Sequence, residues 1–94
     1  MAEKYVIVDK RVSRILEIVT AAYVPFKRLE PLAKTGIDCV KGVLEYYRRG
    51  KIKGDVAYYA IVGCASRHLI PLTEKDLREI MRLLGVRVEK IIIP

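Results

Sequence analysis

The run Val56-Ala-Tyr-Tyr-Ala-Ile-Val62 decides the predicted fold, because it is the most apolar stretch of the chain. Its apolar character is continuous rather than alternating, which is typical of a central strand that is covered on both faces of a parallel sheet. A helix is predicted next, from a capping signal at Thr73 to a stop at Gly85, followed by a closing strand between Val86 and Ile93. Strand, helix and strand together predict a right-handed parallel βαβ unit over residues 55–93.

The first third of the chain predicts a strand and then a helix. Tyr5–Val8 is a short run of β-branched and aromatic residues, which favours a strand. Asp9 is placed to cap a helix, and Pro25 disfavours helical geometry just before it. The apolar positions that share one face of this helix are Val12, Ile15, Leu16, Val19, Ala22 and Tyr23. The segment Phe26–Lys34 predicts a helix of one or two turns, kinked at Pro31.

The middle of the chain reads TGIDCVKGVLEYYRRGKIK over residues 35–53. Thr35, with Asp three residues later, resembles a capping box, and Gly50 is placed as the glycine that ends a helix. Gly42 in the helix interior suggests a close backbone approach. An alternative is that Ile37–Lys41 is a strand and that the helix begins after Gly42.

These elements predict an α/β or α+β fold with about three strands and three to four helices. We expect a single small domain over residues 1–94, with room for one hydrophobic core. A winged-helix arrangement is the alternative fold.

The composition indicates a basic protein with an anionic partner. The formal net charge is +7 and the sequence pI is about 9.6, which favours RNA, DNA or an anionic surface as partner. The chain has no Asn and no Gln, a pattern typical of thermophiles. No run is long enough to cross a membrane and no signal peptide is apparent, so we expect a cytoplasmic protein without membrane contact.

Two cysteines and one histidine are too few for a structural zinc site within one chain. We expect Cys39 and Cys64 to be buried, reduced thiols, although one disulfide between them is possible. We expect no metal and no cofactor.

The end of the 35–53 stretch concentrates positive charge around Tyr46 and Tyr47. Such a cluster can neutralise phosphates, and neighbouring aromatic rings can stack on unpaired bases, which favours RNA over duplex DNA. The alternative is that Glu45 pairs with these cations and leaves an ordinary solvated face. The residues predicted to contact nucleic acid are Lys41, Arg48, Arg49, Lys51, Lys53 and Arg67.

Two families resemble this part of the chain. LAKTGIDCVKGVLEYYRRGKI is similar to winged helix-turn-helix domains, including small-subunit ribosomal members. That resemblance implies a recognition helix carrying Lys41, Glu45, Arg48 and Arg49, with Lys51 and Lys53 beginning the wing. The order TGIDCVKGVLEYYRRGKIK, VAYYAIVG and LREIMRLLGVRVEKII also resembles the ribosomal family that includes the kink-turn-binding proteins. Both resemblances imply a nucleic-acid partner.

The predicted loop Gly63–Pro71 follows the central strand, where open parallel sheets place ligands. Ser66 and Arg67 there are candidates to hold a phosphate. Cys64 and His68, with Asp9, are weaker candidates for a nucleophile, a base and an orienting group.

The favoured function is therefore a non-enzymatic nucleic-acid-binding protein, either part of a ribonucleoprotein or, as an alternative, a winged-helix DNA-binding regulator. A further alternative is a protein-interaction subunit whose charge serves solubility. The apolar end Ile91–Ile93 would then form a sheet edge for a homodimer or a larger assembly.

Overall fold

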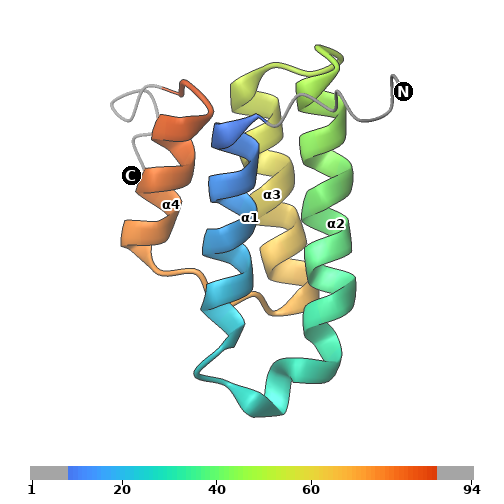
Figure 1. The fold of residues 1–94 in the computed structure, drawn as a ribbon, viewed down its shortest axis with the longest axis vertical. Coiled ribbons are helices and arrows are strands. Elements are labelled where there is room, and N and C mark those ends of the chain that lie inside the picture. Colours follow the sequence, from blue (N-terminus) through green and yellow to red (C-terminus); the bar gives the residue numbers. More distant parts are fainter. Residues whose placement is uncertain (1–8, 87–94) are drawn as a thin grey trace, which may run out of the picture.

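The computed structural model describes residues 9–86, which are mostly helical and contain no strand (Figure 1). The elements are α1 (Lys10–Tyr23), the 3-10 turn η2 (Lys27–Leu29), α2 (Glu30–Arg48), α3 (Gly54–His68) and α4 (Glu74–Leu83). Consecutive α-helices run in opposite directions, and both α1 and α3 pack against α2 and against α4. The described chain is thus an up-and-down bundle of four helices.

The predicted α/β or α+β fold is wrong, because the decisive apolar run lies inside α3 rather than in a strand. Its buried positions Ala57, Tyr58, Ile61 and Cys64 follow helical spacing. Val56 and Tyr59 are apolar or aromatic too, but they are more than half exposed. The run therefore looks continuously apolar although only one side of it is buried.

The other strand-based predictions change with it. The βαβ unit over 55–93 is excluded by α3, and the helix that begins at Gly54 occupies the place of the expected wing. Most of the predicted loop 63–71 is helical, since α3 continues to His68. The expected strand at Tyr5–Val8 and most of the closing strand lie outside the described residues.

The predicted helix starts at Asp9 and Thr73 are confirmed, as are the predicted stops at Gly50 and Gly85. The carboxylate of Asp9 accepts hydrogen bonds from the backbone N–H groups of Arg11 (2.9 Å) and Val12 (3.4 Å) at the start of α1. Thr73 and Asp76 form a reciprocal capping box at the start of α4.

Two of the helices end on a glycine in the left-handed conformation. Gly50 has φ +76° and Gly85 has φ +77°. After α2 the N–H of Lys51 bonds to the carbonyl of Tyr46, and after α4 the N–H of Val86 bonds to that of Met81. Both ends are Schellman motifs, as expected where glycine follows a helix.

The third helix ends on Leu69, a non-glycine residue at φ +54°. This residue adopts the left-handed conformation at a cost of roughly 1–2 kcal/mol. Its side chain is 56% exposed, while the next residue, Ile70, is buried.

Three predictions inside α2 are wrong. Pro31 does not kink a helix but lies in its first turn, where its missing N–H costs nothing. Thr35 does not cap a helix start. It lies in the interior of α2, and its hydroxyl donates to the carbonyl of Leu32 at 3.0 Å. Gly42 marks no close approach, since a Cβ there would meet nothing within 4 Å.

The glycine that does permit a close approach is Gly36. The Tyr23 hydroxyl passes beside it and donates to the carbonyl of His68 at 2.9 Å. A Cβ on Gly36 would collide with that hydroxyl and lie 3.2 Å from the Cβ of His68. Burial raises the pKa of Tyr23 above its ordinary value. The ends of α1 and α3 are joined at this point.

The expectation of reduced thiols is wrong, because Cys39 and Cys64 form a disulfide between α2 and α3. Their Cα atoms are 5.9 Å apart, within the usual range for a disulfide. Cys64 is fully buried in the single core of the described residues. The residues of this core that are almost fully buried are Ile15, Val19, Val40, Leu44, Ala57, Ile61, Cys64 and Ile80.

Candidate nucleic-acid interface

The candidate interface is the turn that joins α2 to α3, together with the last turn of α2. The Schellman motif at Gly50 turns the chain sharply at the end of α2. Lys51 and Lys53 follow within a few residues of Arg48 and Arg49. All four side chains are exposed. We call these four residues the basic turn. These four residues lie together, as expected, because they are nearly contiguous in the sequence, and their contact with nucleic acid stays a prediction.

Glu45 is paired with both arginines of the basic turn. Its carboxylate accepts hydrogen bonds from Arg48 and Arg49, each at 2.7 Å. The bond from Arg48, aided by that from Arg49, lowers the pKa of Glu45. The predicted pairing therefore occurs, but two guanidinium groups share one carboxylate and a positive charge remains. Among the described residues neither Lys51 nor Lys53 has an acidic partner.

The start of α1 lies at the same end of the bundle as the basic turn. The guanidinium of Arg11 lies over the ring of Tyr47, 5.8 Å from its centre, within the range of a cation–π contact. Arg11 also pairs with Asp9 at 3.4 Å. The contact between Arg11 and Tyr47 joins α1 to α2, and nothing in the sequence indicated it.

Of the other predicted contacts, one lies near the basic turn and one does not. Lys41 is exposed seven residues before Arg48, so it lies on the same face of α2 about 10 Å along the axis. Arg67 lies in the last turn of α3, whose first turn adjoins the basic turn. It is therefore about 20 Å from that turn, at the opposite end of the bundle (Figure 1).

Tyr46 and Tyr47 have different environments. Tyr46 is 56% exposed, whereas Tyr47 packs against the core and is covered by Arg11. Tyr59 was expected in a buried strand, but it is 57% exposed in the first half of α3. Helical spacing from the buried Tyr58 would have placed it on the solvent side.

The structure does not bring together the proposed catalytic residues. The sulfur of Cys64 is in the disulfide and is no free nucleophile. Asp9 caps the start of α1, while His68 ends α3 at the other end of the bundle. The phosphate-binding loop at Ser66 is also wrong, since these residues form the last turns of α3, with the backbone geometry of a helix rather than a loop.

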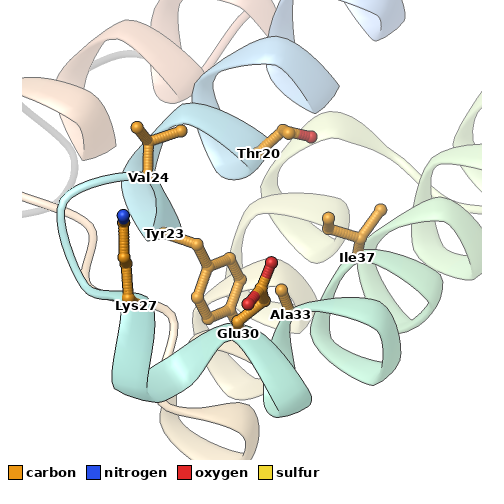
Figure 2. A pocket seen from close by; sticks show the side chains of 7 residues that line it. All are labelled: Thr20, Tyr23, Val24, Lys27, Glu30, Ala33 and Ile37. Carbon is orange, nitrogen blue, oxygen red and sulfur yellow. The ribbon is translucent and has the colours of Figure 1, made fainter.

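A second surface feature is a groove at the end of the bundle away from the basic turn (Figure 2). It lies between the last turn of α1, η2 and the first turns of α2, with a volume of about 440 Å³. Apolar atoms of Val24, Ala33 and Ile37 line it, and Lys27 and Glu30 supply opposite charges. Val24 is 69% exposed.

Comparisons with known proteins returned no match to any family model, curated protein or solved structure. The two family resemblances seen in the sequence therefore stay predictions. Within residues 9–86, no helix has the length and apolar character needed to cross a membrane. The same residues contain no cluster of acidic, His or Cys side chains suited to a metal ion.

Proposed function

We propose that the protein binds nucleic acid, with RNA favoured over DNA, and that the basic turn contacts the phosphates. The observation that carries this proposal is the grouping of Lys51 and Lys53 with the two arginines anchored by Glu45. Several cations on one surface are what phosphate neutralisation requires. Arginines already held in place lose less conformational entropy when they bind an anion.

Two further features support the same end of the bundle. Arg11 lies over Tyr47, the neighbour of Arg48 in α2, and so brings a further cation to this end, although it is paired with Asp9. Helix α3 begins at Gly54, next to the basic turn, so the positive end of its dipole lies at this end of the bundle. No side chain caps its free N–H groups. Asp55 in that turn opposes this effect in part.

The proposal includes a cytoplasmic location in a thermophile. Disulfides are rare in the cytosol of mesophiles but common within hyperthermophilic cells. The Cys39–Cys64 bond and the absence of Asn and Gln are consistent with such a source.

The test is a titration of labelled RNA at several salt concentrations, with two double variants that remove the same charge. Lys51→Ala/Lys53→Ala alters the basic turn, and Lys34→Ala/Arg67→Ala alters exposed residues at the other end. Removing two phosphate contacts to a single strand should reduce the slope of log K against log salt by about 1.4. The control pair should leave that slope almost unchanged. Absence of binding, or equal losses in both variants, would overturn the proposal.

A second candidate function is self-association through the groove of Figure 2. The groove combines exposed apolar surface with Lys27 and Glu30, which carry opposite charges. In a two-fold contact each copy presents the same patch, so Lys27 of one can face Glu30 of the other. Light scattering should then give twice the 10.7 kDa of one chain.

Charge reversal tests this contact directly. Lys27→Glu or Glu30→Lys alone should shift the protein toward monomer, and the two together should restore the dimer. A monomer at all concentrations would exclude this candidate.

A further inference from the structure

Two exposed tyrosines flank the basic turn. Tyr46 lies two residues before the end of α2 and Tyr59 five residues after the start of α3, so both lie within about 8 Å of the turn along the helix axes. The rings are 56% and 57% exposed. Val56, 51% exposed and three residues before Tyr59, extends the same face of α3.

These tyrosines differ from the others in the described chain in leaving much of their surface open. Tyr23 and Tyr58 are 5% exposed, and Tyr47 packs on the core beneath Arg11. Tyr59 meets the ring of Tyr58 edge-on, with centroids 5.4 Å apart and planes at 67°. An edge contact with a buried neighbour restrains Tyr59 without covering both faces of its ring.

We infer that Tyr46 and Tyr59 form a stacking platform for the bases of single-stranded nucleic acid whose phosphates lie on the basic turn. This inference rests on the proposed function and specifies its substrate class. Aromatic rings stack on any unpaired base, whereas a duplex keeps its base faces stacked inside. The positive charge of the turn selects a polyanion rather than an apolar peptide as the occupant of this face.

The experiment compares one fluorescently labelled mixed-sequence RNA, used alone and annealed to its complement, by anisotropy. Tyr46→Ala/Tyr59→Ala removes both rings, and Tyr46→Phe/Tyr59→Phe keeps them. Circular dichroism melting checks that both variants fold, as expected for side chains more than half exposed. The chain contains no Trp, so tyrosine fluorescence gives a second readout with unlabelled RNA.

The native protein should bind the single strand more tightly than the duplex and show quenched tyrosine emission. Loss of each stacked ring should weaken single-strand binding about fivefold or more. Duplex binding should not change in the Ala variant, and the Phe variant should retain single-strand affinity with less quenching.

Each failure has its own meaning. If the Ala variant binds the single strand like the native protein, the stacking platform is refuted and the basic turn alone binds. If neither RNA binds, the proposed function fails and the platform with it. If the Ala variant instead changes the molecular mass in light scattering, the two rings form a subunit contact and the inference is overturned.

Discussion

Reduction of the Cys39–Cys64 disulfide should remove a large part of the stability of this protein. The bond closes a loop with a sequence separation of 25 residues. Constraining such a loop in the unfolded chain stabilises the folded state by about 3.5 kcal/mol in the chain-entropy model. For a domain of this size, that difference corresponds to a melting temperature lower by about 14–28 °C.

Urea unfolding of the oxidised protein, and of the same protein held reduced by a phosphine, measures this difference. The reduced chain should also show a larger dependence of the unfolding free energy on urea, because its unfolded state exposes more surface. A thiol assay on the unfolded, unreduced protein should find no free cysteine. Two free thiols in that assay, or equal unfolding free energies in both redox states, would refute the reasoning.

Further predictions concern single side chains and are checked by thermal melting. Gly36→Ala should destabilise the protein, because the added methyl collides with the Tyr23 hydroxyl. Gly42→Ala should stabilise it by about 1 kcal/mol, because this helix position is exposed and uncrowded. A change of the same sign in both variants would contradict this account. Leu69→Gly should stabilise by about 1 kcal/mol by relieving the left-handed conformation, and no gain over Leu69→Ala would argue against strain there. The pKa of Glu45 is lowered in the folded state. Its contribution to the free energy of unfolding is therefore fully present above the pKa of the unfolded chain and is lost as the pH falls through the pKa of the folded state. Glu45→Gln should therefore melt below the native protein at pH 6 and together with it at low pH, and a gap that persists at low pH would exclude this linkage.

The helix boundaries that the sequence predicted correctly depend on chemistry within a few residues. Asp9 and Thr73 cap with their own side chains, and Gly50 and Gly85 relieve a local steric conflict. Such signals do not depend on what the helix packs against. They therefore hold even though the predicted fold class is wrong.

The same capping signal failed at Thr35, and the neighbouring prolines explain the difference. Pro71 precedes Thr73 by two residues and prevents a helix from entering from upstream. Pro31 precedes Thr35 by four residues and itself lies in the first turn of α2. The helix has already begun when it reaches Thr35, so the threonine has no free N–H groups to cap.

The fold class could not be predicted because α3 has apolar side chains at solvent positions. Val56 and Tyr59 hide the helical period of the buried residues, and the run then resembles a buried strand. The candidate interface was predicted only where it is contiguous, in the basic turn. Arg11 joins it through packing between α1 and α2, which no local pattern encodes. Tyr59 was missed because its segment was predicted to be a buried strand, whereas it is an exposed position of α3.

The position of the disulfide has a consequence for the order in which the bundle opens. It joins α2 to α3, the two helices that already pack most extensively. Helix α4 has only 10 residues and buries just Ile80 and Met81, and its ion pair to α1, Arg14–Glu79 at 3.0 Å, is exposed. Amide protons of α4 should therefore exchange with solvent through partial opening, while those at the centres of α2 and α3 exchange only on global unfolding. The oxidised protein thus has a persistent helical hairpin, which carries the basic turn at its tip, and a less protected helix beside it.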